Sequence, residues 1–446
     1  MTARTLASTL VAMMVAGGAA CRRGGSTGMP TVDWLSVPPQ AGPIGVADNR
    51  RYLVDHAGRP FFLHGEAAWS LISATKREDV ELYLSDRRAR GFNAISVVLI
   101  DHLEPPTNAY GDAPFSVRGD FATPNEAYFA YADWVVRRAA EKGFIVLLSP
   151  CYLGYEGGQE GFYQDVLRNG ESKMRGWGSW VGARYRDFSN IIWLNGGDYN
   201  PPPEGIALLN AVVAGIKAED DRHIHAVHWG PETSGSEIEV PWLDLNTTYT
   251  YKPVYLKALL DHTDASRPFI LLESTYENEH GASTQLLRAQ AYYAVLSGAS
   301  GHVFGSFPVW KFASNWQEEL ASNGALSMSH VRSLFADRSW FTLQPDTASQ
   351  VLTGGSGTKG STDYALLAMT QDRHLAIAYL PSRRAVTVDM RQLAGRARVS
   401  WYDPSNGTWA AIEGSPFASS TPLTFTPPQQ NAAGDGDWVL VLDVAP

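Results

Sequence analysis

The 446-residue chain contains little cysteine, little charge and no concentrated basic segment. Two cysteines in so long a chain exclude a fold held together by a framework of disulfides. Charged residues make up 18% of the chain and hydrophobic residues 44%, which is typical of an ordinary globular protein and not of a disordered one. The net charge is −10 and no run of lysine and arginine occurs, so we expect no nucleic-acid partner.

Several motifs of known chemistry are also missing. The sequence has no HExxH, no cysteine cluster and no calcium loop, and no G-x-S-x-G lies in the part assigned below to a barrel. His223, His225 and His228 lie close together, but positions 225 and 228 of a strand face opposite sides. We therefore expect no catalytic metal, no serine triad and no cofactor.

The N-terminus has the features of an export signal. Arg4 precedes a short apolar segment, 6-LASTLVAMMVAGGAA-20, which is too short to span a bilayer. The small residues before Cys21 resemble a bacterial lipobox, although Gly18 occupies the place of the usual leucine. We expect residues 1–21 to be a signal peptide with lipidation at Cys21, which predicts a lipoprotein of the periplasm or cell surface. Cleavage as a plain signal peptide is the alternative. Residues 22–44 are expected to be a flexible tether, and no later apolar run is long enough for a transmembrane helix.

Residues 45–345 alternate between strand-like and helix-like segments. The helical stretches include 77–91, 126–143, 205–220, 254–263 and 284–298. The expected strands are Phe61–Leu63, Ala94–Ile100, Ile145–Leu148, Ile191–Leu194, Ile224–Val227, Leu243–Asn246, Phe269–Leu272 and His302–Phe304. Eight such units predict an α/β fold of the (β/α)₈ TIM-barrel type. A doubly wound open sheet is the rival, but 64-HGEAAW-69 lacks the phosphate-binding glycine loop expected after its first strand.

Residues 346–446 have a different character. Short alternating strands are separated by glycine, Asn-Gly and proline, and no helical periodicity remains. This pattern predicts a small antiparallel β-sandwich that packs on the barrel, for stability or for weak glycan contact.

Polar and aromatic residues follow the apolar core of each expected barrel strand. They are Glu66, Asp101 and His102, Tyr152, Asn195 with Asp198, His228 and Trp229, Thr248 with Tyr249 and Tyr251, Glu273, and Ser306 with Trp310. Function in such barrels gathers at the C-terminal ends of the strands, so this ring predicts an active site.

Two carboxylates from opposite sides of a barrel mouth are the minimum for glycoside hydrolysis. Asp198, after the fourth strand, and Glu273, after the seventh, form the expected pair. The structural alternative for Asp198 is a helix N-cap. Glu277 is the main competitor of Glu273, whereas Glu279 is expected to be a solvated loop charge.

The remaining candidates would bind substrate, although each aromatic among them could equally be wall packing. Asn195 could orient Asp198, and Glu66 could instead form an ion pair at the barrel floor. The candidates are Glu66, Trp69, Asp101, His102, Asn195, His228, Trp229, Tyr249, Tyr251, Tyr276, Glu277 and Trp310.

These motifs resemble the apiosidase-like glycoside hydrolases. The likeness lies in 60-PFFLHGEAAW-69, 89-ARGFNAI-95, 189-SNIIWLNGGDYN-200, 241-PWLDLN-246, 268-PFILLESTYE-277 and 294-AVLSGASGHVFGSFPVW-310. The tail, with 402-YDPSNGTW-409 and 437-DWVLVLD-443, is similar to the β-sandwich that follows in this family and carries a collagen-binding label. The resemblance implies a (β/α)₈ barrel that cleaves glycosidic bonds of plant cell-wall polysaccharide. Characterised members release apiose from pectic side chains.

Carried over by motif, the resemblance makes Asp198 the acid/base and Glu273 the nucleophile. Two segments depart from the family pattern: 65–69 reads Gly-Glu-Ala-Ala-Trp where Gly-Asp-Thr-Ala-Trp is usual, and 228-HWGPETSGSE-237 replaces a loop that is usually rich in histidine. Both belong to substrate binding, so they leave the sugar open.

The sequence therefore predicts a glycoside hydrolase that acts on a plant-type poly- or oligosaccharide with two carboxyl groups. Retention of configuration is the first expectation and inversion the alternative, since carboxyl groups about 5–5.5 Å apart indicate retention and about 6.5–9.5 Å apart inversion. The alternative is a non-catalytic, glycan-binding surface lipoprotein. Adhesion to collagen and proteolysis are disfavoured, because the chain offers neither a zinc motif nor a serine triad.

Overall fold

A computed structural model describes residues 42–102 and 106–444. The expected signal peptide, Cys21 and the tether up to residue 41 lie outside the described residues. Within the described residues, no helix combines the length and the apolar character needed to cross a membrane.

Eight parallel strands form the centre of the N-terminal domain. Their order is β7-β6-β5-β4-β3-β10-β9-β8, and a bridge between Ala226 and Leu245 closes the sheet between β7 and β8. The strands are β3 (Leu63–Ala67), β4 (Ala94–Val98), β5 (Ile145–Ser149), β6 (Ile191–Gly196), β7 (His225–His228), β8 (Asn246–Tyr249), β9 (Phe269–Glu273) and β10 (Gly301–Phe304). The predicted (β/α)₈ barrel is confirmed. A short hairpin, β1 (Gly45–Val46) with β2 (Leu53–Val54), precedes it.

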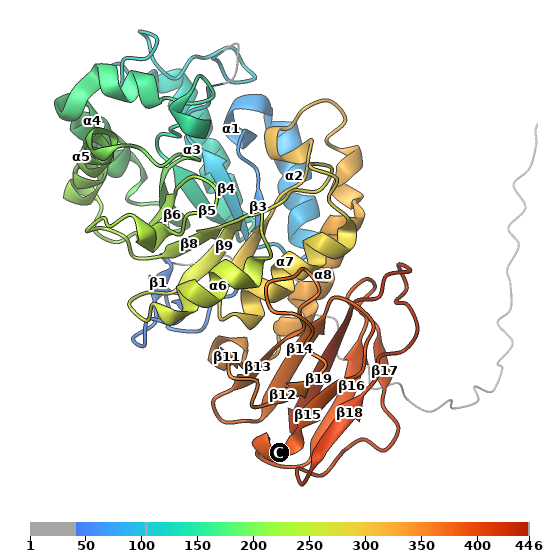
Figure 1. Ribbon diagram of the computed structural model, residues 1–446. Helices are drawn as coiled ribbons and strands as arrows, with labels where there is room; N and C mark the ends of the chain where they lie inside the picture. Colours follow the sequence, from blue (N-terminus) through green and yellow to red (C-terminus); the bar gives the residue numbers. More distant parts are fainter. Residues whose placement is uncertain (1–41, 103–105, 445–446) are drawn as a thin grey trace, which may run out of the picture. The chain divides into compact units, whose positions relative to one another are not determined.

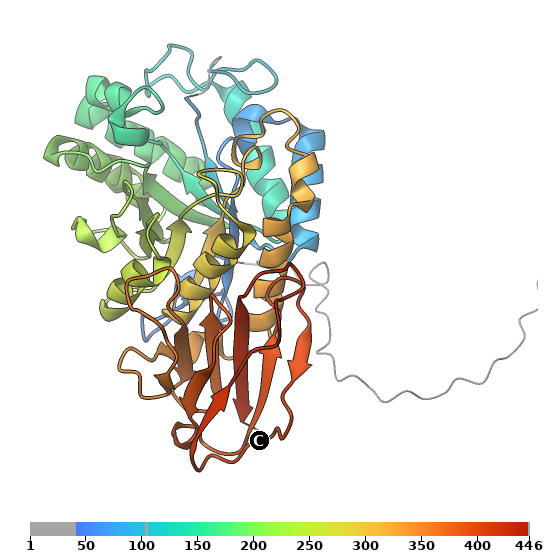
Figure 2. The ribbon, with the colours of Figure 1, turned by 45° about the vertical axis from the view of Figure 1, so that its right-hand side comes forward.

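Helices surround this sheet (Figures 1 and 2). They are α1 (Leu71–Ala74), α2 (Arg77–Ala89), α3 (Glu126–Glu141), α4 (Tyr163–Tyr185), α5 (Pro203–Glu219), α6 (Val254–Thr263), α7 (Thr284–Leu296) and α8 (Asn323–Phe335). Alternate strand residues serve two cores, because successive side chains of a strand face opposite sides. In β6, Ile192 and Leu194 belong to the core inside the barrel, whereas Ile191 and Trp193 belong to the core shared with the helices.

Two barrel strands lie further along the chain than the sequence predicted. The first was expected at Phe61–Leu63 and is β3, and the sixth was expected at Leu243–Asn246 and is β8. Both contain fully buried polar residues, which interrupt the apolar pattern on which the prediction rested. In β8, Thr247 Oγ1 donates to the carbonyl of Val227 at 2.6 Å and Thr248 Oγ1 donates to Asp261 at 2.5 Å, so burial of these hydroxyls costs little.

Helix α4 was absent from the prediction because glycines break its sequence pattern. Those glycines allow α4 and α5 to approach closely, as the two green helices in Figure 1 show. A Cβ at Gly182 of α4 would lie 2.8 Å from the carbonyl oxygen of Ile216, and a Cβ at Gly215 of α5 would lie 2.6 Å from the amide nitrogen of Ser179. Glycine here lowers helix propensity but permits packing that alanine would block.

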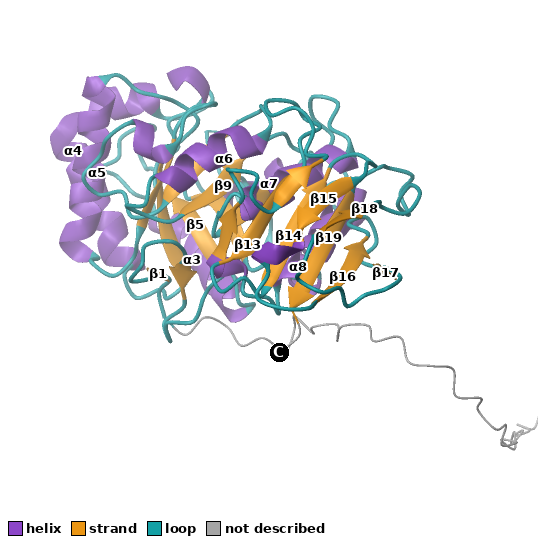
Figure 3. Cartoon of the chain, turned by 60° about the horizontal axis from the view of Figure 1, so that its bottom comes forward, coloured by secondary structure: helices purple, strands orange, loops and turns teal. Residues whose placement is uncertain are grey.

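The C-terminal region is built from two antiparallel sheets that enclose a second apolar core, and strands dominate it (Figure 3). The larger sheet consists of β11 (Leu343–Pro345), β13 (Leu366–Thr370), β14 (Leu375–Leu380), β19 (Trp438–Val444), β16 (Ala397–Tyr402) and β17 (Trp409–Ala411). The smaller sheet consists of β12 (Leu352–Gly354), β15 (Val386–Asp389) and β18 (Pro422–Phe425). The predicted sandwich is thus present, and its first strand begins at Leu343, just before the expected boundary.

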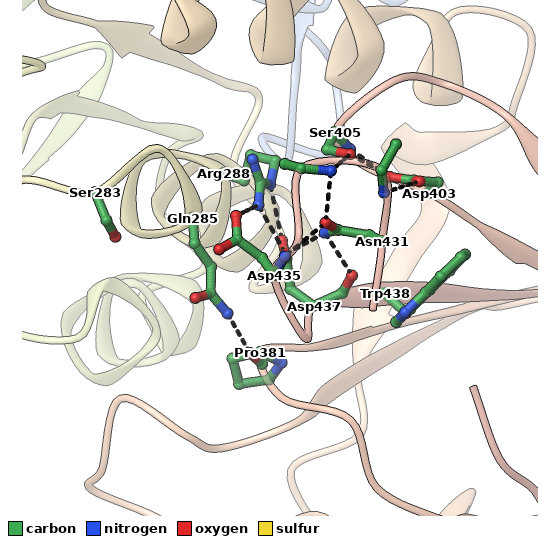
Figure 4. A network of polar contacts seen from close by, with 12 residues as sticks. Ser283, Gln285, Arg288, Pro381, Asp403, Ser405, Asn431, Asp435, Asp437 and Trp438 are labelled. Atoms are coloured by element: carbon green, nitrogen blue, oxygen red, sulfur yellow. Dashed lines mark hydrogen bonds and ion pairs between the residues drawn. The ribbon is translucent and has the colours of Figure 1, made fainter. Parts of the chain in front are cut away.

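A buried ion pair joins the sandwich to the barrel (Figure 4). Arg288 of α7 donates from Nε and from a terminal nitrogen to the two carboxylate oxygens of Asp437, at 2.8 and 2.7 Å. Asp435, Asn431 and Tyr379 complete this network, and both side chains of the central pair are fully buried. Burial raises the pKa of Asp437, and the adjacent guanidinium opposes that shift. The two domains therefore share a desolvated charge pair, which requires both partners.

Candidate active site

The polar residues at the strand ends converge on a cavity of about 330 Å³ at the C-terminal face of the barrel. Ten of the sequence-predicted residues line it: Trp69, Asp101, His102, Tyr152, Asp198, His228, Tyr251, Glu273, Tyr276 and Trp310. The other lining residues are Ser70, Val98, Tyr155, Glu160, Glu279 and Lys311. The cavity combines aromatic faces with carboxylates from opposite sides of the barrel, as sugar chemistry requires.

Two glycines set the direction of Asp198. Gly196, Gly197 and Asp198 have φ values of +88°, +140° and +51°, so three successive residues adopt backbone conformations that favour glycine. A Cβ at Gly196 would lie 2.7 Å from the carbonyl oxygen of His228, and one at Gly197 would lie 2.6 Å from the amide nitrogen of Leu153. Helix α5 begins at Pro203 with Pro202 as its N-cap, so the helix-cap alternative for Asp198 is wrong.

The environment of Asp198 favours its protonated form. Burial is the largest influence and raises the pKa to about 7; the charge of His228 and a hydrogen bond with Tyr249 act in the opposite direction, and the charge of Glu273 adds to the increase. A carboxyl group with a pKa near neutrality can donate a proton in one step and accept one in the next.

Glu273 is the last residue of β9 and is 8% exposed. His228, the last residue of β7, places Nε2 3.0 Å from Glu273 Oε2. Burial lowers the pKa of His228, but the hydrogen bond to Glu273 and the charges of Glu273 and Asp198 outweigh burial and raise it. His228 therefore presents a ring whose protonated form is favoured to the Glu273 carboxylate, at ion-pair distance.

An aromatic framework holds His228 in place. The Trp69 ring stacks on the imidazole, with ring centroids 5.4 Å apart and an interplanar angle of 11°. Trp69 Nε1 donates to the Tyr276 hydroxyl at 3.0 Å. Trp69, which follows β3, and Tyr276, which follows β9, thus support the end of β7 and limit the orientations that His228 can adopt.

Other side chains shape the edge of the cavity. The hydroxyls of Tyr249 and Tyr251 lie 2.9 Å apart, and of these two side chains Tyr251 lines the cavity. Trp310 Nε1 donates to Glu279 at 2.8 Å, and the ammonium group of Lys311 lies 5.3 Å from the Trp310 ring centroid. Glu279 lies in a loop and is partly exposed, as predicted, and it also lines the cavity.

Asp101 and His102, which follow β4, form one side of the cavity. The Asp101 carboxylate accepts a hydrogen bond from Ser73 Oγ at 2.7 Å, and its second oxygen lies 3.3 Å from His102 Nδ1. The His102 ring stacks on Tyr152 with centroids 5.9 Å apart. These contacts hold both predicted residues at the cavity wall.

The structure places Glu66 and Glu277 outside the cavity. Glu66 lies within β3, fully buried, where it pairs with Arg87 Nε of α2 at 2.6 Å and accepts from the Tyr83 hydroxyl at 2.7 Å. It therefore joins strand and helix instead of binding substrate. Glu277 accepts hydrogen bonds from Ser322 Oγ at 2.5 Å and from the Gly324 amide at 2.8 Å. It stabilises the N-terminus of α8 and does not compete with Glu273.

Asn195 and Trp229 also point away from the cavity. Asn195 Nδ2 lies 3.2 Å from His225 Nδ1 and donates to the carbonyl of Ala226, so it links β6 to β7. Trp229 donates from Nε1 to the carbonyl of Gly235 at 3.1 Å and is 1% exposed. The sequence could not separate these residues from the lining, since each follows a strand as the lining residues do.

Four of the lining residues that the prediction omitted belong to two kinds of segment. Ser70 and Lys311 directly follow Trp69 and Trp310, so their position beside predicted residues could have revealed them. Tyr155 and Glu160 lie in the glycine-containing loop after β5, which has no periodic pattern. Among residues 42–102 and 106–444, no group of three or more histidine, cysteine or acidic side chains is arranged to hold a metal ion.

Comparisons with known proteins identify two domains in the chain. Residues 47–342 match the family model of the apiosidase-like catalytic domain, and residues 348–443 match that of a collagen-binding domain of a collagenase. A search of curated protein sequences finds no match.

Two solved structures share the fold of the whole described chain. One is a glycoside hydrolase with 23% identity and a TM-score of 0.81; the alignment covers 92% of this chain and 98% of the other. The second is a glycoside hydrolase of family 5 from Bacteroides vulgatus with 22% identity and the same TM-score, and the coverage is 92% and 95%. With its catalytic domain matched over most of the barrel, the chain belongs to the apiosidase-like family of glycoside hydrolases.

Proposed function

We propose that this glycosidase cleaves its substrate through Asp198 as acid/base and Glu273 as nucleophile, with retention of configuration. The observation that carries the proposal is the pairing of two unlike carboxyl groups in one cavity. Burial brings the pKa of Asp198 to about 7, whereas Glu273 faces the imidazole of His228 at 3.0 Å. Such a difference in environment is how two carboxyl groups acquire different roles.

In the first step, Glu273 attacks the anomeric carbon while the glycosidic bond breaks. Protonated Asp198 donates its proton to the leaving oxygen, so the leaving part departs as an alcohol and a covalent glycosyl-enzyme forms. In the second step, ionised Asp198 removes a proton from water. The oxygen of that water bonds to the anomeric carbon, the bond to Glu273 breaks, and the sugar is released.

The proposed substrate is a plant-type polysaccharide or oligosaccharide, with apiose on a pectic side chain as the first candidate. The match of residues 47–342 to the apiosidase-like catalytic domain supports this choice. The aromatic lining of the cavity by Trp69, Tyr276 and Trp310 supports a ring-shaped ligand.

The test is a screen of the purified protein against pectic and hemicellulosic oligosaccharides, with product analysis by NMR to follow the configuration of the released sugar. The proposal expects a released sugar whose configuration is retained at first appearance. Asp198→Asn and Glu273→Gln should each lower kcat by about 10²–10⁴-fold while oligosaccharide binding persists. Inversion of configuration would refute the assignment of Glu273 as nucleophile. A wild-type protein that binds oligosaccharides but does not cleave any of them would support a glycan-binding protein instead.

We also propose that the protein is exported and anchored by lipid on Cys21. The support is the segment 6–21 of the sequence, with its apolar run and small residues before the cysteine. Growth of an expressing bacterium with a labelled fatty acid should label the wild type and not Cys21→Ser. Equal labelling of both would refute the anchor.

A further inference from the structure

A second cavity adjoins the catalytic one. Its volume is about 500 Å³, and Asp101 and His102 line both cavities. The remaining wall comes from two segments, residues 106–119 after β4 and residues 158–168 after β5. Both cavities therefore lie at the C-terminal ends of the two neighbouring strands β4 and β5, and Asp101 and His102 stand between them.

The second cavity lies on the side of Asp198 and opposite Glu273. In the sheet order, β5 is the direct neighbour of β6, which ends at Gly196, two residues before Asp198. Strand β9, which ends at Glu273, is separated from β4 by β3 and β10. A nucleophile attacks the anomeric carbon from the face opposite the leaving oxygen, and the general acid reaches that oxygen. The part of the substrate that leaves must therefore extend away from Glu273, toward the loops after β4 and β5.

The wall of the second cavity offers the contacts that a sugar uses. Phe115 and Phe162 give apolar faces and are 4% and 9% exposed. Polar side chains share the lining, among them Gln164 and Arg168 of α4. Gln164 Nε2 donates one hydrogen bond to the carbonyl of Gly157 at 3.3 Å, and Arg168 pairs with Asp165, so each keeps further N–H groups for a ligand. Apolar faces beside amide and guanidinium donors suit a ring that carries hydroxyl groups.

We propose that this second cavity binds the leaving part of the substrate, which is itself a sugar unit of an oligosaccharide or polysaccharide and not a small alcohol. The inference rests on the proposed assignment of Asp198 and Glu273, because that assignment sets the direction in which the leaving part extends. It makes Gln164 and Arg168 specificity residues for the chain that carries the cleaved sugar.

The experiment compares two probes that share the cleaved sugar and differ in the leaving part. One is 4-nitrophenyl β-D-apioside, and the other is a pectic oligosaccharide that bears terminal apiose. The ratio of kcat/KM for the oligosaccharide to kcat/KM for the nitrophenyl glycoside is measured for the wild type, Gln164→Ala and Arg168→Ala. Each substitution should lower the ratio by about tenfold, the size expected for a lost hydrogen bond to a charged or amide donor.

Two matched controls lie outside the cavity. Gln371→Ala removes an exposed amide of the sandwich, and Arg186→Ala removes an exposed guanidinium directly after α4. Both should keep the wild-type ratio. A general loss of folding would lower both kcat/KM values together and leave the ratio unchanged, so the ratio separates recognition from stability.

Wild-type turnover with an unchanged ratio in Gln164→Ala and Arg168→Ala would overturn this inference and leave the proposed function intact. Absence of turnover on both probes and across the oligosaccharide screen would overturn the proposed function, and this inference with it. Binding of the oligosaccharide to Glu273→Gln, measured by calorimetry, should also weaken about tenfold when Gln164→Ala is added.

Discussion

The imidazole of His228 interacts with both carboxyl groups that we propose as catalytic: its Nε2 lies 3.0 Å from Glu273 Oε2, and its charge lowers the pKa of Asp198. One side chain thus pairs with the proposed nucleophile and limits how far burial raises the pKa of the proposed acid. Trp69, stacked on the same ring, keeps this arrangement in place.

The activity should fall on the alkaline side of neutrality. Asp198 must carry a proton in the first step, and its pKa is about 7. Above that pH the protonated fraction decreases tenfold for each pH unit, so kcat/KM should decrease in proportion. A profile of kcat/KM from about pH 4 to about pH 9 tests this expectation. A constant value across the alkaline half would contradict the role of Asp198 as general acid.

Replacement of His228 should move this alkaline limb. The imidazolium attracts ionised Asp198 and so lowers its pKa; a neutral side chain removes that attraction, and the pKa of Asp198 should rise. We expect His228→Asn to shift the limb to higher pH and to lower kcat/KM by roughly 10–100-fold, since Glu273 also loses its partner. His374→Asn, at an exposed position of the sandwich, is the control. If the kcat/KM profile of His228→Asn decreased at the same alkaline pH as that of the wild type, His228 would be uncharged during catalysis.

Asp198 should reduce the stability of the fold at neutral and alkaline pH. Its pKa is raised from 3.8 to about 7, so the folded protein binds a proton that the unfolded chain releases between these values. The free energy of unfolding therefore decreases as pH rises through this window and levels off above pH 7. Asp198→Asn should raise Tm relative to the wild type most above pH 7 and least near pH 4.

Thermal unfolding at both pH values measures that difference. Asp187→Asn, at a side chain that is 85% exposed, serves as the matched substitution. An Asp198→Asn gain that is the same at both pH values would mean that the burial of the charge is not its cause.

Glu277 should matter for stability and not for the reaction. Its carboxylate accepts hydrogen bonds from Ser322 and Gly324 at the N-terminus of α8, where the helix dipole favours a negative charge. Glu277→Gln should lower the free energy of unfolding by roughly 1–2 kcal/mol and leave kcat within about twofold of the wild type. Denaturant titration and steady-state kinetics check the two halves, with Glu273→Gln as the comparison. A loss of turnover in Glu277→Gln as large as that in Glu273→Gln would reverse the two assignments.

The ion pair between the barrel and the sandwich should be sensitive to removal of one partner. Arg288→Met leaves the buried carboxylate of Asp437 without its cation, so we expect a loss of about 3–5 kcal/mol. The double variant Arg288→Met/Asp437→Asn removes the uncompensated charge and should recover part of that loss. Calorimetry should show a lower Tm for the single variant, and a double variant no more stable than the single one would contradict this account.

Much of the site was predictable because strand ends in a barrel share one face. The alternation of apolar strands and helices indicated the barrel, and the residues at and shortly after the strand ends gave ten members of the cavity, among them Asp198, Glu273 and His228. The prediction lost accuracy where polar residues were buried. His64, Gly65 and Glu66 lie inside β3, and Thr247 and Thr248 lie inside β8, so periodicity alone placed those strands too early.

The sequence by itself determined the order of the eight barrel strands, the glycines before Asp198 and the presence of a carboxylate at the end of the seventh barrel strand. Only the tertiary structure decided which of the acidic side chains face the cavity. Glu66 and Glu277 follow the same local pattern as Glu273, but Arg87 and the N-terminus of α8 hold them elsewhere. A carboxylate turns toward the partner that compensates its burial, and that partner lies far away in the sequence.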